Sequence, residues 1–157
     1  GHMLFLGFYL ACGALANVAQ VLADPASPIP VVGASGAIAG VMGGYLLLFP
    51  KAKVDILVIF VVFFRVFSIS AWIVLGLWFA LQLLNGAIST AASSGIAYWA
   101  HIGGFAAGLV LIFPLFIRLG AAAFWRRTLG HPPHPEKIYA GSLARVPLVP
   151  RKSNTSK

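Results

Sequence analysis

The amino-acid sequence predicts an all-α protein, a polytopic bundle of transmembrane helices in which four spans are present. Two observations support this prediction. The chain of 157 residues is 60% hydrophobic and only 9% charged, whereas soluble domains carry about a quarter charged residues. Apolar runs long enough to cross a hydrocarbon core of about 30 Å also recur along the chain. We expect the membrane domain to cover residues 4–127, because residues 1–3 (Gly-His-Met) are typical of a cloning scar left after tag cleavage.

Four apolar runs have about the length that a spanning helix needs, and they cover residues 4–22, 33–49, 69–88 and 96–117. Proline, glycine and serine punctuate the connections, and Pro50 ends the second run. Only helices are expected here, because backbone groups that face lipid must be hydrogen-bonded within their own segment.

The segment 54–64 between the second and third runs is apolar and rich in β-branched and aromatic residues. It is too short to cross the membrane as a helix. We expect it to lie at the membrane interface or tucked against the bundle. Counting it as a fifth span would place Arg65 deep in the membrane, which is costly.

Positive charge is gathered in two places. Eight of the eleven lysines and arginines lie from Arg118 onward, and the others are Lys51, Lys53 and Arg65. The four-span topology puts all eleven on one side of the membrane, so the positive-inside rule places both chain ends in the cytoplasm. The net charge of +8 is therefore a topology signal, and we expect no nucleic-acid partner. The predicted location is the cell (inner) membrane.

The C-terminal segment 128–157 mixes proline, serine and basic residues without helical periodicity. It is predicted to be a disordered basic cytoplasmic tail. Its His131 and His134 lack the cysteines or carboxylates that complete a metal site, so no metal is expected. Cys12 is the only cysteine and is interpreted as a small packing residue.

Ser35 opens the second span, in the segment GASGAIAG (residues 33–40). Flanking glycines allow another backbone or a substrate to approach the hydroxyl, and free N–H groups at a helix start can stabilise an oxyanion. Alternatively, Gly33, Gly36 and Gly40 form a helix-packing surface and Ser35 is an ordinary helix cap. This short motif alone favours the second interpretation.

His101 lies near the start of the fourth span, in the segment AHIGGFAAG (residues 100–108). An imidazole in hydrocarbon is costly unless it is hydrogen-bonded, and Gly104 and Gly108 form a face that would bring a partner helix close. A structural histidine bonded to a carbonyl or a hydroxyl group is the alternative.

The four-span topology joins these two motifs. Both spans run from outside to inside, which puts Ser35 and His101 at matching depth. The serine hydroxyl and an imidazole nitrogen could then come within about 3 Å, the distance at which histidine can activate serine. A five-span topology would place them on opposite sides. No carboxylate is available as a third member, because Asp24, Asp55 and Glu136 lie in loops or the tail. Such a Ser–His dyad needs its histidine oriented by packing or by another group.

Both motifs, in this order, resemble those of the rhomboid family of intramembrane serine proteases, with a G-x-S-G nucleophile and a later A-H-x-x-G-x-x-x-G helix. The similarity covers about residues 5–116 and includes Gln20, Trp78 and Gln82. It implies that Ser35 attacks a peptide carbonyl of a transmembrane substrate, that His101 is the general base and acid, and that the Ser35 backbone N–H helps bind the oxyanion. Trp78 resembles part of a lateral substrate gate. No cofactor is implied, and the partners are transmembrane substrates and the lipid bilayer.

The sequence also departs from the family pattern. Rhomboid cores have six spans, and this sequence resembles the last four, so the remaining oxyanion donors are expected in an upstream helix. Because each such donor is typically worth about 3 kcal/mol, the chain alone is expected to be poorly active. Ala39 stands where many members place an aromatic ring against the histidine, so His101 must be supported otherwise.

Two other functions are compatible with parts of this pattern. A non-catalytic rhomboid-like protein would bind transmembrane clients without cleaving them, although retention of both Ser35 and His101 argues against it. A small transporter or channel subunit would need membrane-buried charges or repeated polar residues, which the spans lack.

Overall fold

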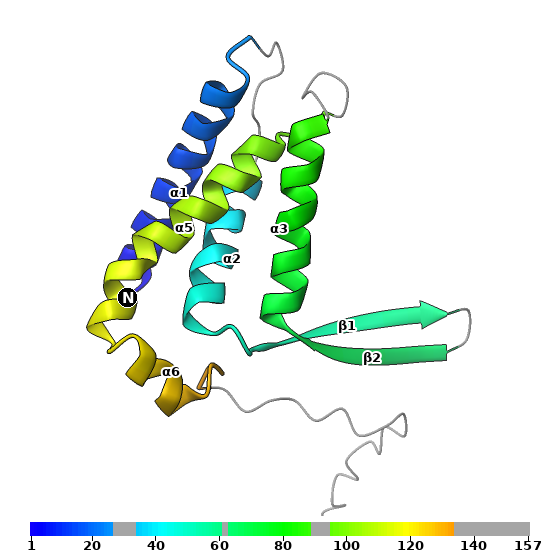
Figure 1. Ribbon diagram of the computed structural model, residues 1–157, viewed down its shortest axis with the longest axis vertical. Coiled ribbons are helices and arrows are strands. Elements are labelled where there is room, and N and C mark those ends of the chain that lie inside the picture. The colour runs from blue at the N-terminus through cyan, green and yellow to red at the C-terminus, as the bar shows by residue number, and fades with distance from the viewer. Residues whose placement is uncertain (27–33, 61–62, 89–94, 134–157) are drawn as a thin grey trace, which may run out of the picture.

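The computed structural model describes residues 1–26, 34–60, 63–88 and 95–133, and the account below is confined to them. The elements follow the order α1 (His2–Ala23), α2 (Ser35–Leu48), β1 (Lys53–Phe60), β2 (Phe63–Ser70), α3 (Ala71–Ile88), α5 (Tyr98–Arg118) and α6 (Ala122–Thr128). Figure 1 shows that α1, α2, α3 and α5 form a bundle whose successive helices alternate in direction. The helical membrane fold predicted from the sequence is confirmed.

Three of the four predicted spans are long, apolar helices. They are α1, α3 and α5, with 22, 18 and 21 residues. The second differs from the prediction of a span over residues 33–49, because α2 has only 14 residues and rises about 21 Å at ~1.5 Å per residue. It ends where Phe49 leaves the helical conformation, as expected for the residue before a proline. Ser35 therefore stands at the start of a short helix.

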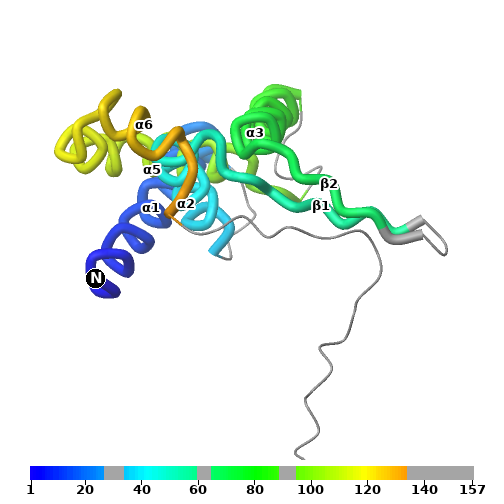
Figure 2. Tube along the Cα trace, turned by 90° about the horizontal axis from the view of Figure 1, so that it is seen from below, coloured from blue at the N-terminus to red at the C-terminus, as the bar shows by residue number. Residues whose placement is uncertain are grey.

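The segment between α2 and α3 corrects the sequence prediction. It forms an antiparallel hairpin, in which Lys53 pairs with Ser70 and Phe60 with Phe63. Figures 1 and 2 show that β1 and β2 project away from the bundle, so the segment is not tucked against the helices, and the mostly helical fold carries a small two-stranded sheet. β-Branched and aromatic residues favour strands, and cross-strand pairing satisfies backbone groups locally. Because Ile69 and Ser70 belong to β2, α3 begins two residues later than expected.

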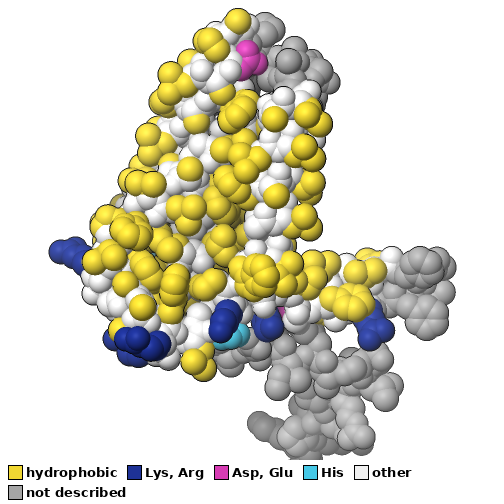
Figure 3. All heavy atoms as spheres, in the orientation of Figure 1, with side chains coloured by type: hydrophobic (Ala, Val, Ile, Leu, Met, Phe, Trp, Pro, Cys, Tyr) yellow, Lys and Arg dark blue, Asp and Glu magenta, His cyan; other side chains and the backbone are white. Residues whose placement is uncertain are grey.

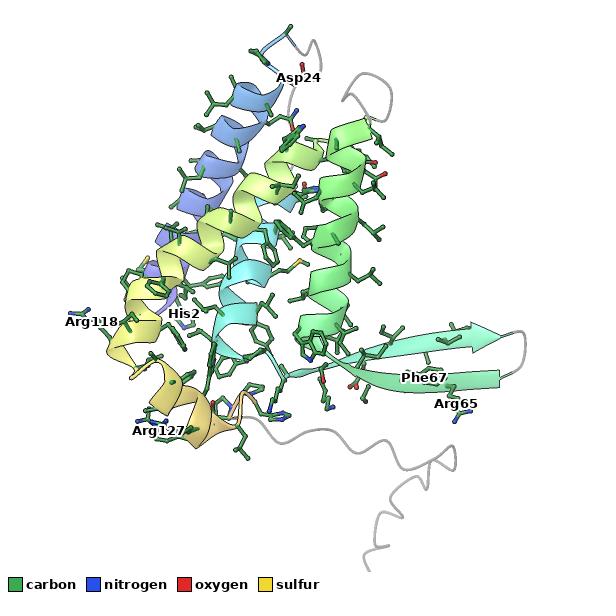
Figure 4. The ribbon with its side chains drawn as sticks, viewed as in Figure 1. His2, Asp24, Arg65, Phe67, Arg118 and Arg127 are labelled. Carbon is green, nitrogen blue, oxygen red and sulfur yellow. The ribbon has the colours of Figure 1, made fainter. Side chains whose placement is uncertain are left out.

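Charged residues gather at one end of the bundle. Figure 3 shows the Lys and Arg side chains around the lower end, with apolar side chains covering the helices above them. Figure 4 locates Arg118 and Arg127 there and Arg65 out on the hairpin, toward the same end of the structure, while Asp24 lies at the other end beyond α1. Lys51 and Lys53 follow α2 at the same lower end. The described basic residues are thus arranged as the four-span topology requires.

The short helix α6 is absent from the sequence prediction. Its Phe124 is buried and packs edge-on against Phe116, and the Trp125 indole N–H donates a hydrogen bond to the Leu47 carbonyl at 3.0 Å. These contacts tie α6 to the ends of α2 and α5. Thr128, the last residue of α6, is also the first residue of the predicted tail. Residues 134–157 of that tail lie outside the described residues.

The most extensive helix interface in the described chain joins α2 and α5. A Cβ atom added at Gly104 would collide with the carbonyl group of Gly36, and one added at Gly108 would collide with that of Gly40. The two backbones are therefore in direct contact along this face, which is possible only for glycine. Gly33, expected to extend the packing surface, lies outside the described residues.

A buried hydrogen bond connects α1 to the start of α5. The Gln20 side chain is 3% exposed, and its Oε1 atom accepts a hydrogen bond from the Ala100 backbone N–H at 3.1 Å. The first N–H groups of a helix have no partner four residues earlier, so Gln20 caps α5 from a neighbouring helix. This contact fixes the depth at which α5 begins and therefore the position of its first turns.

Replacement of Gln20 by leucine is expected to lower the free energy of unfolding by about 0.5–1.5 kcal/mol, because it removes a buried hydrogen bond from the Ala100 N–H, which keeps its second acceptor, the Ala97 carbonyl, at 3.1 Å. Thermal unfolding in detergent measures the effect. Asn17→Ala is the matched control, since the Asn17 amide is exposed and bonds only to the Gly13 carbonyl of its own helix. Equal stability of the two variants would contradict a capping role for Gln20.

Candidate active site

Ser35 is the first residue of α2, and its side chain is exposed. The first intrahelical bond of this helix runs from the Ile38 N–H to the Ala34 carbonyl at 2.9 Å. The N–H groups of Ser35, Gly36 and Ala37 precede that bond and have no acceptor within the helix. A hydroxyl beside N–H groups that have no acceptor within their own helix, at the positive end of that helix, is suited to a reaction that develops negative charge on oxygen.

His101 lies on the first turns of α5 and is half-buried. Its Nδ1 atom lies 2.9 Å from Oε1 of Gln82, which is on α3. The ring of Trp78, one turn earlier on α3, lies 5.8 Å from the imidazole between centroids. The imidazole is therefore held by a hydrogen bond and an aromatic ring that come from the same neighbouring helix.

The candidate residues lie on adjoining segments of α2 and α5. A Cβ atom added at Gly36, the residue after Ser35, would lie 3.4 Å from the carbonyl oxygen of Ala100, the residue before His101. The structure thus brings the two backbones together at the start of both helices. No hydrogen bond joins the Ser35 hydroxyl to the imidazole among the described contacts, where the recorded partner of His101 is Gln82.

The aromatic support of His101 comes from α3 and not from α2. Ala39, where an aromatic residue was noted as missing, is buried at 1% exposure. Trp78 resembles part of a lateral substrate gate. In the structure its ring centroid lies 5.8 Å from that of His101 and 6.1 Å from that of Phe105. Phe79 stacks on Phe105 at 4.6 Å. These contacts anchor the first turns of α5 to the middle of α3.

Gln82 is among the residues that carry the family resemblance, but sequence reasoning did not pair it with His101. The signal that could have found this pair is spacing, because residues four apart lie on one helix face. Trp78 and Gln82 have this spacing, and both meet His101. No described carboxylate takes the Gln82 position, and Asp55 accepts a hydrogen bond from Ser68 at 2.5 Å in the hairpin.

The apolar bundle and its helix lengths define a multi-pass membrane protein. Comparison with protein families gives a match to the rhomboid domain over residues 1–118, so the chain belongs to the rhomboid family. No curated protein and no solved structure matches the chain. Rhomboid proteins are generally intramembrane serine proteases.

Proposed function

We propose that this chain is an intramembrane serine endopeptidase that cleaves transmembrane protein substrates, with Ser35 as the nucleophile and His101 as the general base and acid. One observation carries the proposal. The backbones of α2 and α5 touch at Gly36, the residue after Ser35, and at Gly104, one turn after His101, and a Cβ atom added at Gly36 would lie 3.4 Å from the carbonyl oxygen of Ala100, the residue before His101. A nucleophile and its base must be within hydrogen-bond reach, and this packing places their main chains close enough for that.

The proposed reaction starts with the Ser35 hydroxyl, which has no hydrogen bond in the described structure and is exposed. Rotation of its side chain brings Oγ toward His101, a contact that often tightens only when substrate is bound. Oγ attacks the substrate carbonyl while the imidazole takes its proton. His101 then protonates the departing amine, and water hydrolyses the acyl-enzyme with His101 again acting as base.

Negative charge on the tetrahedral intermediate develops at the carbonyl oxygen. We place this oxygen against the Ser35 backbone N–H, at the start of α2, where the helix dipole adds to the stabilisation. Further oxyanion donors are proposed to come from an upstream helix outside the four described here. A donor of this kind is typically worth about 3 kcal/mol, so the rate should depend strongly on their presence.

The proposed orientation follows from charge. Lys51, Lys53, Arg118 and the other described basic residues lie at one end of the bundle, and α2 and α5 begin toward the opposite end. The positive-inside rule then places the basic end in the cytoplasm of a cell with an inner membrane. The Ser35–His101 pair accordingly opens toward the outer side.

Fluorophosphonate labelling, with the modified residue located by mass spectrometry, tests this function. The probe is applied to intact cells in a membrane-impermeant form and to detergent-solubilised protein. We expect Ser35 to be labelled from outside, Ser35→Ala to abolish labelling, and the hairpin control Ser68→Ala to leave it unchanged.

The experiment is run on this chain and on the longest form encoded by the same gene, so that the contribution of further donors is measured. Labelling that appears only in the longer form would support their upstream location. Absence of Ser35 labelling from both forms would overturn the protease proposal and favour a protein that binds transmembrane clients without cleaving them. Labelling that reaches Ser35 only from the cytoplasmic side would overturn the orientation.

A further inference from the structure

The Gln82 side chain places an amide group among the apolar side chains of α3. It is 9% exposed, although most of the side chains around it on the helix are apolar and face outward. Burying an amide without a hydrogen bond is costly in hydrocarbon-like surroundings. Its recorded side-chain partner among the described residues is the Nδ1 atom of His101, 2.9 Å from Oε1. The pair is therefore a specific contact between α3 and the candidate base.

Three further contacts limit how the imidazole can turn. Trp78 packs against it from α3, the Ala100 N–H beside it is bonded to Gln20, and Gly104, one turn later, touches the α2 backbone. The ring itself is thus held by Gln82 and Trp78 of α3, and the other two contacts fix the α5 backbone that carries it against α1 and α2. What remains for the substrate side is the other ring nitrogen, Nε2.

The geometry points to Gln82 as a positioning residue of the active site, whose Oε1 accepts a hydrogen bond from Nδ1–H of His101 and so leaves Nε2 unprotonated for Ser35. This inference rests on the proposed protease function. A neutral imidazole carries one proton, so an oxygen acceptor at Nδ1 selects the tautomer that has a lone pair at Nε2. Gln82 would thereby fill the place that an aspartate holds in serine protease triads.

The chemistry of the amide suits its location. When His101 takes the Ser35 proton at Nε2, both ring nitrogens become donors, and the Nδ1–H bond to Oε1 becomes charge-assisted and stronger. The amide oxygen therefore stabilises the intermediate without carrying a charge of its own. A carboxylate at this depth would do the same, but its own burial in the membrane would be costly.

A purely structural Gln82 would behave differently. The amide could then equally present its NH₂ group to an unprotonated Nδ1, which would put the ring proton on Nε2 and leave no acceptor for the serine. Nitrogen-15 NMR of histidine-labelled protein in detergent separates the two tautomers. The His101 resonances are assigned by comparison with His101→Ala.

We expect wild-type protein to show the Nδ1–H tautomer. In Gln82→Leu the ring should lose this preference and the rate of Ser35 labelling should fall at least about tenfold, within the factor of about 10⁴ that loss of the orienting aspartate costs a serine protease. Gln82→Glu keeps an oxygen acceptor and cannot donate when ionised, so it should retain the tautomer and most of the rate. Asn85→Leu is the matched control, because the Asn85 amide on the same helix bonds to the Leu81 carbonyl.

The Nε2–H tautomer in wild-type protein would overturn the inference, as would an unchanged tautomer and labelling rate in folded Gln82→Leu. Should Gln82→Leu not fold, the wild-type spectrum and the Gln82→Glu rate decide the question. Failure of the protease proposal gives a different result, in which Ser35 is unlabelled in every variant. The wild-type tautomer then still decides whether Gln82 orients His101.

Discussion

His101→Ala is expected to lower the rate of fluorophosphonate labelling at Ser35 by about 10³-fold, within the 10²–10⁴-fold range that general acid–base groups contribute. The serine hydroxyl is a weak nucleophile at neutral pH and needs a base to take its proton. The same loss is expected in cleavage of a transmembrane substrate, where His101 must also protonate the leaving amine. Both rates are measured under single-turnover conditions, in the longest form of the protein that is active.

The matched control is His131→Ala, since His131 follows α6 (Ala122–Thr128), whereas His101 lies on the first turns of α5. Thermal unfolding in detergent accompanies both variants, because loss of the Gln82 contact also removes a hydrogen bond. A folded His101→Ala protein that is labelled at the wild-type rate would rule out His101 as the base. An equal loss in His131→Ala would point to a general effect on the membrane domain.

Gly104→Ala is expected to damage both the stability of the bundle and the candidate site. The added Cβ atom would meet the Gly36 carbonyl group, and overpacking of this kind typically costs about 1–3 kcal/mol of unfolding free energy. The two helices must move apart beside Ser35, and a displacement of about 1 Å can lower a reaction rate about 100-fold. We therefore expect lower thermal stability together with slower labelling of Ser35.

Gly76→Ala on α3 provides the comparison. Apart from the neighbouring backbone of α3 itself, no described atom lies within 4 Å of a Cβ placed at that position. Alanine is favoured over glycine inside a helix by roughly 0.5–1 kcal/mol, so this variant should be as stable as wild type or more stable. Wild-type stability of Gly104→Ala would show that α2 and α5 do not require backbone contact at Gly36.

The helical bundle could be predicted because its signals are carried by long segments. Apolar length predicted α1, α3 and α5, and the distribution of lysine and arginine predicted that α2 and α5 run in the same direction. That shared direction was enough to associate Ser35 with His101. The structure adds that their backbones adjoin at Gly36 and Ala100.

The sequence prediction failed where a short segment is compatible with more than one structure. Residues 54–64 are mostly apolar, β-branched or aromatic, a composition shared by buried segments and by strands, and only the pairing of residues 53–60 with residues 63–70 distinguishes the hairpin. Helix α6 has 7 residues, too few to show a period. The bond between Gln82 and His101 depends on how α3 is rotated against α5, which is a property of packing that no local pattern contains.

The attachment of α3 has a mechanical consequence. α3 packs on the rest of the bundle less extensively than α1, α2 and α5 pack on one another, and Trp78 and Gln82 are among its contacts with α5. If α3 swings outward to admit a substrate, the same movement withdraws both the ring and the oxygen that hold His101. Substrate admission and catalysis would then occur at different times. The proposed protease would have a correctly held His101 only after α3 has returned to the bundle.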